Sequence, residues 1–135
     1  MTTTTVTAPK IQCRNIRKTC ELGKETFVAL GDVSLDIADS EFVDAPRDGR
    51  AAHHLLDVGA IGNLVVRGSR FQNGFLGDLV RSRARENFVL YSMLADGEGG
   101  KASYELDFPN GGIAYVIGNV LGQSEGTDNP GVGGY

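Results

Sequence analysis

Cysteine is scarce in this sequence, and so is the histidine that often accompanies it in metal sites. The chain has 135 residues but only two cysteines, Cys13 and Cys20, and two histidines. Two cysteines with no nearby histidine do not make a zinc site. A disulfide between residues seven apart requires a particular local geometry, so reduced cysteines on β-strands are the favoured interpretation. We therefore expect neither a metal nor a cofactor.

Long apolar runs and an excess of positive charge are also missing. No apolar stretch approaches the roughly 20 residues of a membrane span, and residues 1–9, "MTTTTVTAP", have neither the basic start nor the apolar core of a signal peptide. The net charge of −4 argues against nucleic acid as a partner. The composition is that of a soluble, single-domain globular protein. We expect a cytoplasmic location and a disordered tail over residues 1–8.

What is present in the first third is the alternation of apolar and polar residues that is typical of β-strands. Residues 10–20 and 26–37 both alternate, and "ELGKE" between them carries the glycine of a hairpin turn. The letters "EFV" at residues 41–43 begin a third strand. This pattern predicts an antiparallel β-meander over residues 9–43.

The same segment resembles the start of an ATP-binding subunit of an ABC transporter, most similar to the nitrate, sulfonate and taurine importers. The resemblance rests mainly on "ALGDVSLDIADSEFV" at residues 29–43. In that family the last strand leads into the phosphate loop G-x-x-x-x-G-K-[ST], whose backbone N–H groups cradle phosphates. Here Val43 leads into "DAPRDGRAAHHLLD", and Cys20 replaces the aromatic residue that stacks on adenine. The resemblance therefore implies a truncated start with no nucleotide-binding residues and no ATPase activity.

A short motif recurs three times in the second half of the chain, as "VRGSRF", "VLYSML" and "VIGNVL". Its aligned columns are Val66/Val89/Val116, Gly68/Tyr91/Gly118, Ser69/Ser92/Asn119 and Phe71/Leu94/Leu121. A period in the twenties, with strands and no helical segments, predicts a parallel β-solenoid of about three coils. The short polar column is expected to hydrogen bond to the backbone where the chain bends between strands.

Residues 59–135 resemble a bacterial family of right-handed parallel β-helix proteins of the pectate-lyase-like kind. The resemblance is carried by "GNLVVRGSRFQNG", "VRSRA", "DGEGGKASYELDFPNGG" and "VIGNVLGQSEGTDNP". It implies an all-β fold, a short right-handed parallel β-helix preceded by the antiparallel meander. Residues 44–58 are then a junction, and the chain is interpreted as a fusion of two segments with different origins.

Several charged residues of the second half are candidates for ligand binding on one face of stacked coils. With Tyr104 as a ring that could stack on a sugar, the candidates are Asp78, Arg81, Arg83, Tyr104, Glu105 and Asp107. Many β-helix proteins bind or cleave polysaccharide on such a face with paired carboxylates and cations. The alternative is that Arg81 pairs with Glu105, or Arg83 with Asp107, across coils on a solvated surface. That alternative is favoured, and no residue is assigned as catalytic.

Two further patterns are more simply explained by structure than by chemistry. His53 and His54 are adjacent, so on a strand they would point in opposite directions and not share one metal; a solvated linker is favoured. The stretch "DGEGGK" at residues 96–101 resembles a calcium-loop fragment but lacks the ligand order of an EF-hand. A turn is the favoured interpretation there.

Three functions follow from these patterns. The leading hypothesis is a non-catalytic β-helix remnant that binds carbohydrate, fused to a truncated ABC-ATPase start. The alternatives are a fragment of an ABC transporter subunit and a fragment of a polysaccharide lyase or hydrolase. A carboxylate pair in a groove would favour the enzyme, whereas an ion-paired face would count against it. Self-association through open solenoid edges is expected unless the N-terminal strands cover the first coil.

Overall fold

The computed structural model describes residues 11–14, 17–22, 25–30, 33–127 and 129–135, with the backbone alone for 17–22 and 25–30. The regular elements of these residues are all β-strands, and none of the described segments is a helix able to cross a membrane. In chain order the strands are β1 (Ile11–Arg14), β2 (Arg17–Leu22), β3 (Glu25–Leu30), β4 (Ser34–Ala38), β5 (Glu41–Val43), β6 (Leu56–Val58), β7 (Asn63–Arg67), β8 (Arg70–Gln72), β9 (Val80–Ser82), β10 (Glu86–Leu90), β11 (Met93–Ala95), β12 (Leu106–Asp107), β13 (Ile113–Ile117), β14 (Val120–Gly122) and β15 (Gly133–Gly134).

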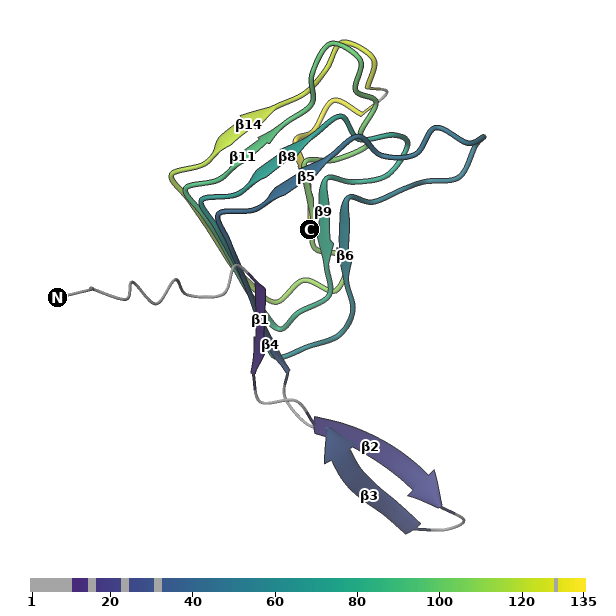
Figure 1. Cartoon of the computed structure of the whole chain (residues 1–135), viewed down its shortest axis with the longest axis vertical. Helices are drawn as coiled ribbons and strands as arrows, with labels where there is room; N and C mark the ends of the chain where they lie inside the picture. Colours follow the sequence, from purple (N-terminus) through teal and green to yellow (C-terminus); the bar gives the residue numbers. More distant parts are fainter. Residues whose placement is uncertain (1–10, 15–16, 23–24, 31–32, 128) are drawn as a thin grey trace, which may run out of the picture.

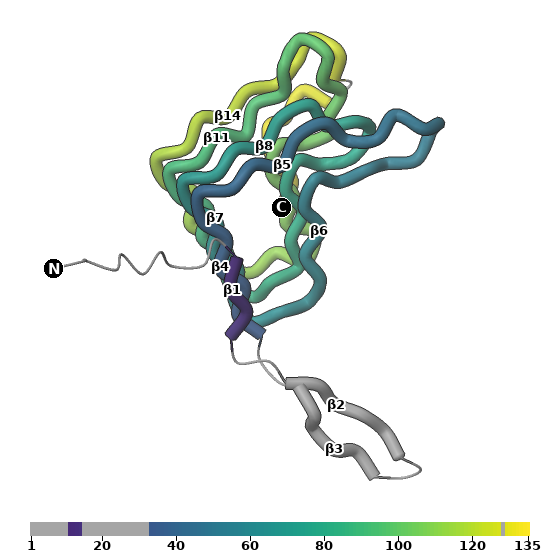
Figure 2. Tube along the Cα trace, viewed as in Figure 1, coloured from purple at the N-terminus to yellow at the C-terminus, as the bar shows by residue number. Residues whose placement is uncertain are grey.

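Strands β4 to β15 wind into a parallel β-solenoid of about four turns, each of which contributes one strand to each of three walls (Figure 1). Sheet 1 has the order β1-β4-β7-β10-β13, sheet 2 the order β14-β11-β8-β5, and sheet 3 the order β15-β12-β9-β6. The chain trace shows successive turns stacked behind one another around a common interior (Figure 2). The predicted all-β class and the parallel solenoid are confirmed.

The three-fold motif sets the register of the stack as the sequence predicts. Val89 lies directly between Val66 and Val116 in sheet 1, and Leu94 lies between Phe71 and Leu121 in sheet 2. These columns face inward because strand residues alternate between the two faces of a sheet, and the columns of three coils therefore stack into one core. Val66, Val89, Phe71 and Leu94 are all completely buried.

The stack has one coil more than the motif predicts, because β4, β5 and β6 form a first turn. β4 pairs in parallel with β7, and β5 pairs in parallel with β8. Inside this turn Phe42 stacks on Phe71, with ring centroids 4.8 Å apart. Residues 34–43, which the alternation assigns to an antiparallel meander, therefore share the core of the residues that follow them. The junction segment contributes β6, which pairs in parallel with β9.

Antiparallel pairing is found only at the N-terminal side of the described strands. β1 pairs with β4 from Ile11↔Ile37 to Arg14↔Ser34, so β1 covers the edge of sheet 1 at the first coil. β2 and β3 pair with each other. In sheet 1, one N-terminal strand, β1, therefore covers the first coil, as the sequence analysis considered.

A two-residue corner joins sheet 1 to sheet 2 in every coil. Its first residue has a positive φ, at Asp39 (47°), Gly68 (56°), Tyr91 (49°) and Gly118 (68°). Its second residue is small and polar, and it links the coils: the Ser40 N–H donates to Ser69 Oγ, the Ser69 N–H to Ser92 Oγ, and the Ser92 N–H to Asn119 Oδ1. The predicted hydrogen bonding of the small polar column to the bending backbone is confirmed.

Candidate functional site

The outer face of sheet 3 carries a column of alternating charge that runs along the stack. The register places Arg81 of β9 between Asp57 of β6 and Asp107 of β12. The Arg81 Nε lies 3.2 Å from Asp107 Oδ2, and one residue pair further along the strands the Arg83 Nη1 lies 3.0 Å from Asp57 Oδ1. Ion pairs across coils are therefore present, but with other partners than the predicted Glu105 for Arg81 and Asp107 for Arg83.

A second polar column precedes these strands and is centred on Asp78. The Asp78 N–H donates to His54 Nδ1 at 2.9 Å, and the Tyr104 N–H donates to Asp78 Oδ1 at 3.2 Å. The His54 Nδ1 also lies 3.1 Å from Asp78 Oδ2, and its Nε2 lies 3.2 Å from Arg81 Nη1. Burial raises the pKa of Asp78, and the neighbouring His54 opposes part of this shift. The Asp78 carboxylate is thus held by the coils on both sides of it.

His54 is the residue of this cluster that sequence reasoning missed. The sequence favours a solvated linker for the adjacent histidines, but the side chain of His54 is mostly buried and linked to Asp78 and Arg81. His53 lies 2.7 Å from Asp48 in the loop instead. A signal was available, since His54 precedes the pair Leu55-Leu56 just as Asp78 precedes Leu79-Val80.

Glu105 does not lie with the other candidate residues, because it points into the solenoid. Its side chain is 1% exposed, and the carboxylate oxygen Oε2 has no hydrogen-bond partner among the described residues. Its backbone N–H donates to Val132 O and its backbone C=O accepts from Val80 N–H, so Glu105 stands where Leu79 stands in the previous coil. Burial in this apolar column raises the pKa of Glu105 to about 7.

The stretch "DGEGGK" forms a turn that is held by its own aspartate. Asp96 Oδ1 accepts the N–H of Gly74 from the previous coil, and Asp96 Oδ2 accepts the N–H of Ala102, both at 2.7 Å. Both carboxylate oxygens are therefore occupied by backbone donors. Within the described part of the chain, no three His, Cys, Asp or Glu side chains are grouped as a metal site would require.

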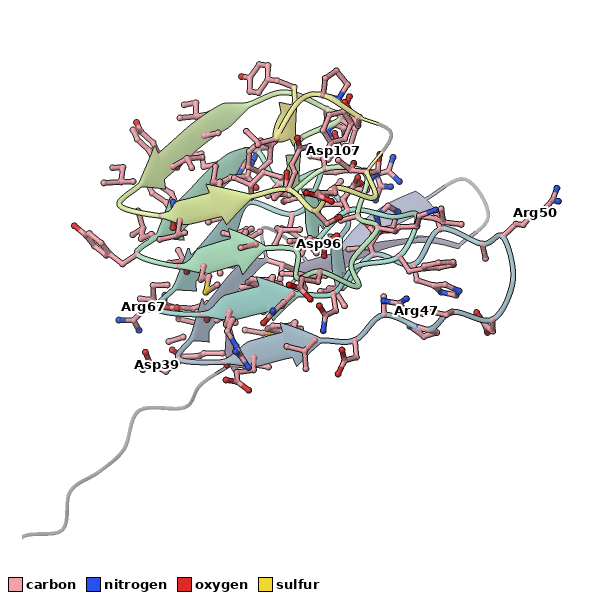
Figure 3. The ribbon with its side chains drawn as sticks, turned by 90° about the horizontal axis from the view of Figure 1, so that it is seen from above. Asp39, Arg47, Arg50, Arg67, Asp96 and Asp107 are labelled. Carbon is pink, nitrogen blue, oxygen red and sulfur yellow. The ribbon has the colours of Figure 1, made fainter. Side chains whose placement is uncertain are left out.

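The loop after β5 leads away from the stack at the point where the resemblance to an ABC subunit would require a phosphate loop. Figure 3 shows Arg50 at the outer end of this loop, while the guanidinium of Arg47 lies 5.7 Å from the ring centroid of Phe75. The loop returns through His53, whose N–H donates to Phe75 O. Cys20 lies in β2, where the structure describes the backbone alone, so its relation to a base is outside the described residues.

A groove of about 480 Å³ lies at the corner where sheet 3 leads back to sheet 1. We call it the corner groove, and its lining residues are Val33, Ala60, Ile61, Gly62, Arg83, Ala84, Arg85, Asn110, Gly111 and Gly112. These residues come from successive turns that are stacked by hydrogen bonds: the Arg85 N–H donates to Ile61 O at 3.0 Å, and the Ile113 N–H donates to Arg85 O at 2.9 Å. The corner groove therefore runs along the stack.

Glycine is required on the floor of the corner groove. Gly112 has a φ of +99°, and a Cβ atom there would lie 2.6 Å from Arg85 O. The described side chains that line the groove and can hydrogen bond are Arg83, Arg85 and Asn110, and no Asp, Glu or His is among the described residues of the lining. The groove can therefore donate hydrogen bonds to an extended ligand, but its lining offers no general acid or base.

Comparison with family models, with curated proteins and with solved structures finds no match to this chain. Of the six residues predicted as ligand-binding, the structure places Arg81 and Asp107 on the outer face of sheet 3, and buried Asp78 just before β9, linked to them through His54. It places Arg83 in the corner groove and Glu105 in the core. The backbone N–H of Tyr104 donates a hydrogen bond to Asp78 Oδ1.

Proposed function

We propose that this protein is a non-catalytic β-solenoid that binds an acidic polysaccharide in the corner groove. The observation that carries the proposal is the make-up of the groove: it crosses three successive turns, and among the described residues its charged lining side chains are the cations Arg83 and Arg85. Guanidinium groups donate paired hydrogen bonds to carboxylates, and Asn110 adds an amide that suits hydroxyl groups.

The dimensions of the corner groove support an extended, repetitive ligand. Coils of a parallel solenoid are spaced by about 4.8 Å, the distance between neighbouring strands, so three turns span roughly 10 Å. Volumes of about 300–1,000 Å³ are usual for ligand sites, and the groove has about 480 Å³. A polymer of uronic acids offers a carboxylate on each ring. Arg83 and Arg85 lie two residues apart in the middle one of the three turns, where they can meet such a carboxylate, while Asn110 lies in the next turn.

The distribution of carboxylates supports binding without cleavage. Glycoside hydrolysis uses a pair of carboxyl groups that flank the scissile bond. On sheet 3, Asp107 and Asp57 are each paired with an arginine, and Asp78 in the segment before β9 contacts His54 and accepts a backbone N–H. This ion-paired face favours the binding hypothesis over the lyase or hydrolase.

The first test is calorimetric titration of the full chain with tetragalacturonate, with cellotetraose as the neutral comparison. Tetragalacturonate is expected to bind, and the heat signal should weaken as salt rises because the contacts are ionic. Arg83→Ala should weaken the affinity by about tenfold or more, as expected for loss of a charge-assisted hydrogen bond.

Arg70→Ala is the matched control, since Arg70 is likewise an arginine in an ion pair across coils, 3.2 Å from Glu41 on sheet 2. It should leave the affinity unchanged. Equal losses in the two variants, or equal affinity for the acidic and the neutral tetrasaccharide, would contradict the proposal. Formation of reducing or unsaturated ends by the wild-type protein would show that it is an enzyme.

A further inference from the structure

The last strand of sheet 1, β13, exposes an unpaired edge. The Ile113 N–H and the Ile117 C=O both bond toward β10, through Arg85 O and Tyr91 N. Because the backbone groups of a strand alternate in direction, the N–H and C=O groups of Ala114 and Val116 point to the opposite side. Among the described strands none pairs with β13 on that side. At the other end of the same sheet, β1 covers β4.

Charge is absent from this part of the chain. Residues 108–124 contain no Asp, Glu, Lys, Arg or His, in a chain whose net charge is −4. The corresponding strands of the first three coils each carry a charge, at Asp36, Arg67 and Glu86. Exposed edges are commonly protected by charged residues or proline. β13 has neither, so a second uncharged strand can approach it without repulsion or loss of ion pairs.

The sequence of β13 is nearly symmetric about its central residue. Ile113, Tyr115 and Ile117 share the outer face, while Ala114 and Val116 share the inner face, as their partners in β10 show. In an antiparallel pair centred on Tyr115, Ile113 of each copy would meet Ile117 of the other copy, and Ala114 would meet Val116. The strand is therefore complementary to itself.

The ring of Tyr115 also has a free face. One face stacks on Phe88 of the preceding coil, with centroids 4.9 Å apart and planes 10° from parallel. Because β13 is the outermost of the described strands of sheet 1, the opposite face of the ring points toward the open edge. Tyrosine pairs across strands add to sheet stability. A second Tyr115 placed across the edge would continue this stack.

The interior of the solenoid is open at the same end. An apolar cavity of about 400 Å³ has among its lining Leu106, Phe108, Val116, Leu121 and Val132. Val116 and Val132 are more than 40% exposed. A two-fold axis perpendicular to sheet 1, midway between two paired β13 strands and level with their central residue, would bring two such openings face to face. Pairing at β13 would therefore also bury apolar surface that one copy leaves in water.

From these observations we propose that the occupant of this end is a second copy of the chain, joined by antiparallel pairing of β13 about a two-fold axis at Tyr115. Four backbone hydrogen bonds would form, from Ala114 and Val116 of each copy to Val116 and Ala114 of the other. The two Tyr115 residues would form a non-hydrogen-bonded pair, in which side chains are closest. The interface is isologous, so assembly stops at the dimer. It lies outside the corner groove and does not depend on ligand binding.

Cross-linking tests this register in the full chain. With Cys13→Ser and Cys20→Ser as background, Tyr115→Cys should form a covalent dimer under mild oxidation, because the paired Cα atoms would be about 4.5 Å apart. Ile113→Cys is the matched control. In the proposed dimer the two copies of residue 113 would be offset by four residues along the strands, roughly 13 Å apart. The Ile113→Cys variant should therefore remain monomeric on a denaturing gel. Equal cross-linking of the two variants would overturn the proposal.

Sedimentation equilibrium of the unmodified protein gives the second readout. A dimer of twice the chain mass is expected, and Tyr115→Lys should raise the dissociation constant by about tenfold or more because two like charges would meet on the axis. Ile11→Lys places the same charge on the exposed edge strand β1 and should leave the dimer intact. A wild-type monomer at all concentrations, or an open-ended polymer, would refute the two-fold interface. Circular dichroism shows whether each variant is folded. If Tyr115→Lys does not fold, the mass of the wild-type protein and the comparison of Tyr115→Cys with Ile113→Cys still test the proposed dimer.

Discussion

A single ionisable side chain in the core makes the stability of this protein depend on pH. Glu105 is almost completely buried, and its Oε2 has no partner among the described residues. Desolvation disfavours the charged form of a carboxyl group, and nearby Asp96 and Asp78 act in the same direction. The pKa of Glu105 is therefore raised from 4.5 in the unfolded chain to about 7 in the fold.

The sign of the effect follows from proton binding. Between pH 4.5 and 7 the folded protein holds a proton on Glu105 that the unfolded chain releases, so the free energy of unfolding falls as pH rises through this range. The full difference between these two pKa values corresponds to about 3 kcal/mol. Burial also raises the pKa of Asp78, which contributes a slope of the same sign.

Glu105→Gln should remove most of this pH dependence, because glutamine keeps the shape without an ionisable proton. Urea unfolding at pH 5 and pH 8 measures it: the variant should be more stable than the wild type at pH 8, by about 2–3 kcal/mol, and similar to it at pH 5. Glu98→Gln changes the same charge on an exposed residue of the adjoining loop and should follow the wild-type curve. A wild-type protein whose stability rises from pH 5 to pH 8 would contradict this assignment.

The interior position of Glu105 could not be derived from simple alternation. Strict period-two counting puts Glu105 on the same face as Asp107, whereas the structure buries both Glu105 and Leu106. The reason is a bend before β12, where two successive residues face the interior. The same doublet occurs as Leu79-Val80 in the previous coil, so an alignment of this column would have placed Glu105 inside.

At the scale of elements, the corner between sheets 1 and 2 is the most repetitive feature and holds successive coils in register. Ser92 has two roles there: its Oγ accepts the Ser69 N–H at 3.1 Å and donates to Leu90 O at 3.0 Å. Both Ser69 and Ser92 are buried. A buried N–H group left without an acceptor costs free energy, so each corner hydroxyl stabilises the coil before it as well as its own.

Ser92→Ala should therefore destabilise the protein by about 1–3 kcal/mol, the penalty of an unsatisfied buried donor. Chemical denaturation measures the loss. Ser92→Asn is the conservative comparison, because Asn119 in the same column accepts the Ser92 N–H through its side-chain oxygen. It should recover most of the stability. If Ser92→Ala is as stable as the wild type, the corner hydrogen bonds do not hold the coils together.

The sequence predicts the last three coils better than the first, for a physical reason. Alternation in "SLDI" and "EFV" identifies strands but does not distinguish parallel from antiparallel pairing. The long loop between β5 and β6 also makes the distance from the first copy of the motif to the second longer than the later spacings. The first copy is nevertheless present, because Ile37, Asp39, Ser40 and Phe42 have the spacing of Val66, Gly68, Ser69 and Phe71. The structure aligns Ile37 with Val66 and Phe42 with Phe71, so the motif occurs four times.

In the whole molecule, the two ends of the solenoid differ in whether the edge of sheet 1 is covered by another strand. β1 covers sheet 1 at the first coil, with Arg14 3.4 Å from Asp36. β13 at the last coil has an open, uncharged edge among the described strands. A parallel solenoid cannot close on itself, so its edges must be covered, charged or paired. This asymmetry predicts a defined dimer through β13 rather than open-ended stacking.

The separate origins implied by the two resemblances remain a prediction. What the structure adds is that residues 34–43 share one core with the following coils, since Ile37 and Val66 are buried side by side. The site was less predictable than the fold, because most residues that line the corner groove are small or apolar and give no chemical signal in the sequence. Of the residues chosen by charge and spacing, only Arg83 belongs to it.

Amide hydrogen exchange of the full chain, with and without tetragalacturonate, tests directly whether the corner groove binds an acidic polysaccharide. Binding in the corner groove should slow exchange in the three turns at residues 60–62, 83–85 and 110–112, and leave sheet 3 around Arg81 and Asp107 unchanged. Protection confined to sheet 3, or none at saturating ligand, would contradict the account.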